Sequence, residues 1–293
     1  MQTILGIDVG ASGIKGALVD LKTGKLSGER FRVPTPQPST PAAMAGAFAE
    51  IVEFFGYKGP VGCGFPSIVK NGVCHSAANI DKSWIGTNIE TTFGEACGNP
   101  VFATNDADAA GMAEMRFGMG KDENGLVILL TIGTGIGSAM FYKGHMLPGT
   151  ELGHLIFKNN RIAEAYCSSG ARERLKISRK EWASRFNEYL HHLERIFSPD
   201  LFILGGGESK FFEQYKHLLT TDARVVPAIL VEAQRRERAQ RAPDDGRHAA
   251  AHRTLVCLLD ARCEHGRRVA GVADHGRGER QRPRIGNRGA LVA

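Results

Sequence analysis

Short apolar runs separated by glycine-rich turns dominate the hydrophobic pattern of the chain. This pattern predicts a strand over Thr3 to Val9, a turn over Gly10 to Gly13 and a second strand over Ile14 to Leu21. A Thr23-Gly24 turn follows, and a third strand is expected near Phe31. The chain is therefore predicted to open as an antiparallel meander.

The same order of elements recurs about 123 residues later. The pattern there predicts a strand over Leu126 to Ile132, a turn over Gly133 to Gly135 and a strand over Ile136 to Tyr142, before a Lys143-Gly144 turn. We therefore expect two structurally similar α/β halves, each opening with a strand, a glycine turn and a strand.

Helices and further strands are predicted to complete both halves. A helix capped by Thr40 precedes strands over Val61 to Gly64 and Val101 to Thr104, and the second of these strands runs into a helix at Asn105-Asp106. In the second half, helical spacing links Trp182 to Phe197. That helix ends at Pro199 and is followed by a strand over Leu201 to Leu204 and a turn over Gly205 to Gly207.

Composition indicates a globular protein, with 42% hydrophobic and 23% charged residues in 293 residues and no apolar run long enough for a membrane span. The net charge of +6 lies entirely in residues 231–293, which hold 14 arginines and no lysine against 8 acidic residues. Positions 1–230 balance 23 basic against 23 acidic residues.

The segment 231–293 lacks aromatic residues, methionine and serine, so it offers little to bury. It is either a genuine basic arm or the product of a reading-frame change near residue 230, and we favour the second interpretation. We assign no nucleic-acid partner to it. Six scattered cysteines without a CxxC pair, together with an N-terminus that lacks a secretory signal, favour a cytoplasmic location.

Three glycine turns follow apolar strands, and glycine lets backbone N–H groups approach an anion closely. Hairpins also need glycine, but three such turns, two of them in matching halves, favour a phosphate-binding role. Neither a Walker sequence nor a dinucleotide fingerprint is present. Asp8 is suited to hold Mg²⁺ through water, while Ser12 and Lys15 are suited to phosphoryl oxygens. The candidate phosphate- or nucleotide-binding residues are Asp8, Gly10, Ala11, Ser12, Gly13, Lys15, Thr134, Gly135, Gly205 and Gly206.

Asp106, at the end of a strand, is the candidate general base for phosphoryl transfer to an alcohol. The competing interpretation is that Asp106 only caps the helix. Asp108 is expected to point away down the helix as an ordinary acid of the first turn. Glu151 and His154 share one face of a turn, where they could bind a metal or a polyhydroxylated substrate, and the incomplete zinc pattern favours the substrate.

In combination, ILGIDVGASGIKGA, GFPS, TNDADAAG, LTIGTGIGSAMF, TELGH and LFILGGG resemble the ROK family of sugar kinases, within the actin/hexokinase superfamily. The resemblance covers about residues 3 to 228 and is strongest to the family's bacterial polyphosphate glucokinases, including those that use polyphosphate or ATP on glucose and mannose. It implies an α/β actin/hexokinase-like (ribonuclease H-like) fold. The implied halves are a small domain over 1–107 and a larger one over 108–230, with 231–293 as an atypical tail.

The resemblance also implies roles for individual residues. Asp106 corresponds to the catalytic base on the sugar 6-hydroxyl, and Mg²⁺ is the expected cofactor. The implied sugar-binding residues are Ser67, Asn79, Asn105, Asp106, Glu151, His154 and Glu164, the last of which precedes Ala165-Tyr166.

This chain departs from the family pattern in two places. It lacks the CxCGxxGC zinc site that many ROK proteins carry, so no structural zinc is expected. After Val225-Val226-Pro227-Ala228, the family continues into a glycine- and alanine-containing helix, whereas this chain continues as ILVEAQRRERAQ. Because that helix packs across the domain junction in the superfamily, the change bears on stability and domain closure.

The sequence therefore predicts a kinase that transfers the terminal phosphoryl group of polyphosphate or ATP to glucose, with mannose as a further acceptor, and that acts as a monomer or homodimer. The alternatives are a strictly ATP-dependent glucokinase and a non-catalytic, sugar-sensing ROK-like protein. A repressor with a helix-turn-helix is disfavoured because the first strand begins near residue 3, and an actin-like or chaperone-like ATPase would not use the TELGH and EAY residues. Polyphosphate or nucleic-acid binding by the tail would be lost on truncation at residue 230.

Overall fold

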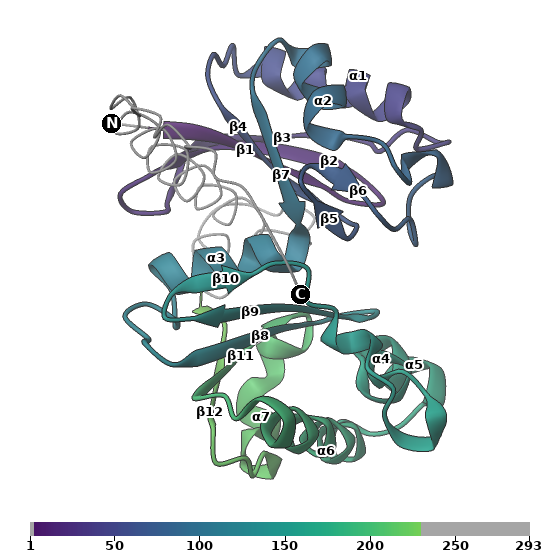
Figure 1. The fold of residues 1–293 in the computed structure, drawn as a ribbon, viewed down its shortest axis with the longest axis vertical. Helices are drawn as coiled ribbons and strands as arrows, with labels where there is room; N and C mark the ends of the chain where they lie inside the picture. Colours follow the sequence, from purple (N-terminus) through teal and green to yellow (C-terminus); the bar gives the residue numbers. More distant parts are fainter. Residues whose placement is uncertain (1–2, 230–293) are drawn as a thin grey trace, which may run out of the picture. The chain divides into compact units, whose positions relative to one another are not determined.

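The computed structural model describes residues 3–229, so the interpretations of segment 231–293 lie outside the described residues. Two five-stranded sheets form its framework, ordered β3-β2-β1-β4-β7 and β10-β9-β8-β11-β12 (Figure 1). In each sheet the first three strands in chain order pair antiparallel, and the last two strands add to the sheet in parallel. The recurrence expected from the glycine turns is thus confirmed at the level of sheet topology.

The first half has the following elements in chain order: β1 (Thr3–Val9), β2 (Ile14–Asp20), β3 (Leu26–Val33), α1 (Pro41–Phe54), β4 (Val61–Phe65), β5 (Val69–Lys70), β6 (Val73–Cys74), η1 (Lys82–Trp84), α2 (Ile89–Cys97) and β7 (Val101–Asn105). As predicted, the Thr40 side chain caps α1 by accepting from the Ala43 N–H group, and Pro41 occupies the first helical position. Helices α1 and α2 bury Phe48 and Phe93 as a stacked pair in the core of this half.

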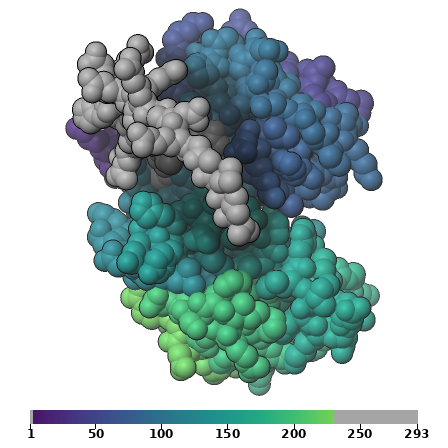
Figure 2. Space-filling model, in the orientation of Figure 1, coloured from purple at the N-terminus to yellow at the C-terminus, as the bar shows by residue number. Residues whose placement is uncertain are grey.

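The second half continues with α3 (Asp106–Phe117), β8 (Leu126–Ile132), β9 (Ile136–Tyr142), β10 (His145–Leu147), η2 (Leu152–His154), η3 (Lys158–Asn160), α4 (Ala163–Cys167), α5 (Ser169–Leu175), α6 (Arg179–Phe197), β11 (Leu201–Gly206), η4 (Glu208–Phe211), α7 (Phe212–Tyr215), η5 (Lys216–Leu218) and β12 (Arg224–Pro227). Helix α6 buries Trp182, Phe186 and Leu190 against the sheet, as its spacing predicts. In Figure 2 the residues of the two halves gather in separate regions of the visible surface, purple to blue and teal to green.

Strand β11 is longer than predicted. It continues through Gly205 and Gly206, which pair with Thr131 and Ile132 of β8, so the turn expected over 205–207 begins only at the end of this pairing. Gly206 has a φ of 79°, and an added Cβ would lie 2.4 Å from the backbone oxygen of Ile132. This position therefore requires glycine for both conformation and space.

Helix α3 follows β7 of the first sheet and packs on β9 of the second. Its Gly111 lies so close to the second sheet that an added Cβ would be 2.6 Å from the Phe141 ring. Helix α3 is thus in contact with both sheets. None of the helices in the described range 3–229 is long and apolar enough to cross a membrane.

Candidate active site

The junction of β7 and α3 places Asn105 and Asp106 at the centre of the candidate site. Asn105, not Asp106, is the helix cap, because its side-chain oxygen accepts from the Ala107 N–H group at 2.8 Å and the Asp108 N–H group at 3.3 Å. The capping alternative for Asp106 is therefore wrong. Asp106 is the first helical residue and keeps its carboxylate accessible to solvent. Although the residue is exposed, the protein around its carboxyl group desolvates it enough to raise its pKa above the usual value.

Asn105 also connects the site to Ser67, whose backbone oxygen accepts a hydrogen bond from Asn105 Nδ2 at 3.0 Å. Ser67 is buried and lies 3.0 Å from the Cys74 sulfur. The structure thus brings two of the predicted sugar-binding residues together. Asn79 is exposed, and within residues 3–229 no hydrogen bond joins it to the other candidates.

Asp8 and Lys15 face each other across the first glycine turn, paired in register at the ends of β1 and β2. Burial of Asp8, followed by the charge of Asp106 and opposed by that of Lys15, raises the pKa of Asp8 to about 7. Because the charge of Asp106 contributes to this shift, the two carboxyl groups lie near each other.

His154 lies between two carboxylates. Its Nδ1 is 3.9 Å from Glu151 Oε2, and its Nε2 is 3.8 Å from Glu164 Oε1. Partial burial raises the pKa of Glu151, and the charge of Asp106 adds to that shift while His154 opposes it. The three predicted sugar-binding residues of this half therefore form one cluster beside Asp106, with acceptors and donors suited to hydroxyl groups.

The second glycine turn is held by the elements that carry this cluster. Glu164 Oε2 accepts from the Ile136 N–H group at 3.2 Å, next to Gly135. On the other side of the turn, the Ser168 hydroxyl donates to the Thr134 oxygen at 2.9 Å and the Gly170 N–H group donates to the Gly133 oxygen at 3.1 Å. Ser168 and Gly170, which lie outside the turn, thus hold two of its carbonyl groups by hydrogen bonds.

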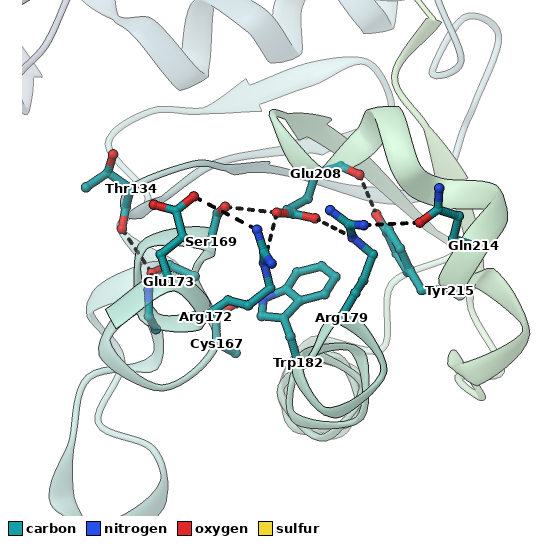
Figure 3. A network of polar contacts seen from close by, with 12 residues as sticks. Thr134, Cys167, Ser169, Arg172, Glu173, Arg179, Trp182, Glu208, Gln214 and Tyr215 are labelled. Atoms are coloured by element: carbon teal, nitrogen blue, oxygen red, sulfur yellow. Dashed lines mark hydrogen bonds and ion pairs between the residues drawn. The ribbon is translucent and has the colours of Figure 1, made fainter. Parts of the chain in front are cut away.

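A buried ion-pair network secures the third glycine turn, and sequence reasoning missed it (Figure 3). Glu208 follows the turn directly and has a side chain only 3% exposed. It lies 3.4 Å from Arg172 Nε and 3.2 Å from Arg179 Nε, and it accepts from the Ser169 hydroxyl at 2.9 Å. Arg179 also packs on the Phe211 ring, with its Cζ atom 3.7 Å from the centroid. The only sequence signal was the position of Glu208 directly after three glycines.

Asp108 lies in the first turn of α3, as predicted, but it is not the ordinary acid that was expected there. It is 2% exposed, and its Oδ2 accepts from the Gly149 N–H group at 3.3 Å, while its Oδ1 is buried without a hydrogen-bond partner in the structure. Burial, together with the nearby charges of Glu151 and Asp106, raises its pKa to about 7. The prediction failed because the loop that carries Glu151 folds back over the first turn of α3.

Comparison with known proteins identifies the family. The ROK family model matches residues 4–174. The chain is 49% identical over 226 residues to a polyphosphate glucokinase of Mycobacterium tuberculosis, which covers 77% of this chain and 85% of the relative. A polyphosphate glucokinase of Mycobacterium leprae is 45% identical over 226 residues, which is 77% of this chain and 69% of the relative.

Solved structures agree with this result. The inorganic polyphosphate/ATP-glucomannokinase of Arthrobacter sp. strain KM matches with a TM-score of 0.76 and 42% identity, over 90% of this chain and all of that one. A ROK family glucokinase from Streptomyces griseus, solved with glucose and AMPPNP, matches with a TM-score of 0.65 at 22% identity over 89% of this chain and 99% of that one, a likeness of fold alone. The chain therefore belongs to the ROK family and is a kinase with the actin/hexokinase-like α/β fold.

Proposed function

We propose that this kinase transfers the terminal phosphoryl group of inorganic polyphosphate or ATP to the 6-hydroxyl of glucose, and that it also accepts mannose. The observation that carries the proposal is the position of Asp106, a solvent-accessible carboxylate with a raised pKa that lies beside both Asp8 and Glu151. The relatives named for polyphosphate glucokinase and polyphosphate/ATP-glucomannokinase activities support the choice of substrates.

Asp106 acts as the general base in this proposal. The sugar O6 forms a bond to the terminal phosphorus of the donor, the bond from that phosphorus to its bridging oxygen breaks, and the hydroxyl proton passes to the Asp106 carboxylate. A donor shortened by one phosphoryl group leaves. A carboxylate whose pKa lies above the usual value accepts this proton more readily than an ordinary aspartate, provided that the carboxylate is ionised at the start.

The cluster of Glu151, His154 and Glu164 holds the sugar. Carboxylate oxygens accept hydrogen bonds from sugar hydroxyls, and the imidazole of His154 donates or accepts according to its tautomer. Asn105, at the end of β7, orients the sugar from the other side. Its amide group is held by hydrogen bonds to the Ala107 N–H group and to the Ser67 backbone oxygen. Such fixed positions favour the alignment on which phosphoryl transfer depends.

The glycine turns receive the donor. The first turn supplies Ser12 and Lys15, and the second turn supplies backbone N–H groups around Thr134 and Gly135. Mg²⁺ fits this site, because the Asp8 carboxylate lies beside the first glycine turn and Mg²⁺ in kinases is commonly held by one or two carboxylates plus substrate phosphates. Asp8 would hold the ion, which neutralises negative charge on the phosphoryl groups when bound.

The domain division is part of the same proposal. We place the boundary between residues 107 and 108, inside the first turn of α3, with one sheet on each side. This division separates Asp8, Ser67 and Asp106 from Glu151 and Glu164, so the substrates would bind between the two halves.

Formation of glucose 6-phosphate tests the function directly. Purified protein is incubated with Mg²⁺ and glucose, with polyphosphate as the sole donor and ATP in a parallel reaction. Turnover with polyphosphate supports the full proposal, and turnover with ATP alone reduces it to an ATP-dependent glucokinase. Glucose binding without turnover from either donor would instead indicate a sugar-sensing protein.

The Asp106→Asn variant tests the base. We expect kcat to fall by at least about 100-fold, because general-base catalysis contributes factors of this order, while the glucose Kd measured by calorimetry stays within about threefold of wild type. Asp20→Asn, at an exposed turn, is the matched control and should keep wild-type kcat. An Asp106→Asn variant with near wild-type kcat would refute the assignment of the base.

A further inference from the structure

Arg32 lies against the first glycine turn, and the sequence analysis did not select it. Its guanidinium Nη2 donates to the Ser12 backbone oxygen at 2.8 Å. An added Cβ at Gly13 would lie 2.6 Å from Arg32 Nε, so the absence of a side chain at Gly13 is what lets the guanidinium lie there. The residue is nevertheless exposed to solvent. A fixed, accessible cation therefore borders the turn.

Strand register aligns Arg32 with the charged residues of the site. Asp8 of β1 pairs with Lys15 of β2, and Lys15 pairs with Arg32 of β3. Residues directly opposite each other in neighbouring strands lie on the same face of the sheet. Because adjacent strands are about 4.8 Å apart, the row of three positions extends about 10 Å from Asp8 to Arg32. This row leads from Asp8 across the sheet to its edge strand β3.

Anchoring of the turn does not by itself explain the charge of Arg32. The neighbouring Gly10 backbone oxygen is held by the Thr35 hydroxyl at 2.6 Å, so a neutral, buried side chain of the same segment performs that task. A carbonyl oxygen needs only one neutral donor, whereas a guanidinium offers five N–H groups in a planar fork that suits phosphate oxygens. The donor groups of Arg32 beyond Nη2 are suited to an anion.

We propose that Arg32 is a donor-binding residue whose guanidinium contacts a phosphoryl group of the phosphoanhydride donor behind the one that is transferred. This inference rests on the proposed function for the identity of the donor. The shared chemistry of polyphosphate and ATP is a chain of phosphoryl groups, and the row from Asp8 through Lys15 to Arg32 follows such a chain. In this arrangement the terminal phosphoryl group of the donor lies near Asp8, and Arg32 contacts the phosphoryl groups behind it.

Two substitutions separate charge from anchoring. Arg32→Gln keeps an N–H donor for the Ser12 oxygen but removes the charge, whereas Arg32→Lys keeps the charge but loses the planar fork. The control is Lys22→Gln, which removes one exposed positive charge at the turn beyond the other end of β2. Thermal unfolding of each variant verifies that it is folded.

The measurement is calorimetric binding of tripolyphosphate, and separately of ATP, in the presence of glucose and Mg²⁺, together with the donor KM. We expect Arg32→Gln to raise the donor Kd and KM by about tenfold, because hydrogen bonds to charged groups are worth about that factor at an accessible site. Arg32→Lys should recover most of this loss, Lys22→Gln should match wild type, and the glucose Kd should be unchanged in all variants. A loss confined to tripolyphosphate or to ATP would support the proposal and assign Arg32 to that donor.

Wild-type donor binding by Arg32→Gln would overturn the proposal and leave Arg32 as an anchor of the turn. Equal weakening of glucose and donor binding would overturn it as well, because it would indicate a general distortion of the site. Failure of the proposed function has a different signature. Wild-type protein would then make no glucose 6-phosphate, while tripolyphosphate binding would still report on Arg32.

Discussion

Replacing Asp108 with asparagine should stabilise the protein relative to wild type as the pH rises from 5 to 8. Asparagine has nearly the same shape as aspartate, and its side-chain oxygen can still accept from the Gly149 N–H group. It cannot ionise. The variant therefore removes the cost of a buried negative charge while it retains the one hydrogen bond that Asp108 makes with the loop before Glu151.

The magnitude follows from the pKa of Asp108, which burial raises from 3.8 to about 7 in the folded state. Between these values the folded protein retains a proton that the unfolded chain has released, so wild-type stability falls as the pH rises. The slope approaches about 1.4 kcal/mol per pH unit. From pH 5 to pH 8, the difference in unfolding free energy between variant and wild type should therefore move by about 2 to 3 kcal/mol in favour of the variant.

The assay is urea unfolding at several pH values between 5 and 8, followed by the fluorescence of the buried residues Trp84 and Trp182. Asp20→Asn is the control. Hydrogen bonds from Thr23 lower the pKa of Asp20, so its stabilising effect is lost only as the pH falls below the usual range of aspartate, and its variant should show no trend between pH 5 and 8. A constant difference between Asp108→Asn and wild type from pH 5 to 8 would refute the argument.

Substitutions at two glycines and one glutamate give further predictions. An added Cβ at Gly133 would meet nothing within 4 Å among the described residues, so Gly133→Ala should keep its urea midpoint, and we expect the donor KM to rise because the methyl group occupies space left for the donor. Gly206→Ala, by contrast, should lower the unfolding free energy by about 2 kcal/mol or more, since φ is 79° and the new Cβ meets the Ile132 backbone; an unchanged urea midpoint would contradict this. Glu208→Gln should cost about 3 kcal/mol in the same assay because two arginines lose a buried partner, and a loss below about 1 kcal/mol would show that the network contributes little.

The strands that carry the turns could be predicted from the sequence because each is a continuous or alternating apolar run between glycines. The predicted bounds of β8 and β9 agree with those in the structure, and β2 differs at its end by one residue. The short strands β5, β6 and β10 were not predicted, since each has only two or three residues and its pairing depends on neighbouring loops. The local periodicity of the sequence does not show which segment a short strand will pair with.

The position of a candidate residue could be predicted where that residue lies at the end of a strand or directly after it, as for Asp8 and Asp106. It was not predictable where burial depends on a distant loop. Asp108 is buried because a segment about 40 residues later covers it, and Arg32 reaches Ser12 only through the pairing of β3 with β2. Helical spacing alone places Asp108 on a different side of α3 from Asp106, but it does not reveal which side the rest of the chain covers.

The two hairpins of similar topology differ in the side chains that they carry next to their turns. In the last pair but one before each turn, Asp8 lies opposite Lys15 in the first hairpin, and Thr131 lies opposite Gly137 in the second. The two hairpins therefore have the same strand order but different charges at the same register position. Two turns of like backbone are thus electrostatically unlike, so an anion placed between them would meet charged side chains on one side alone.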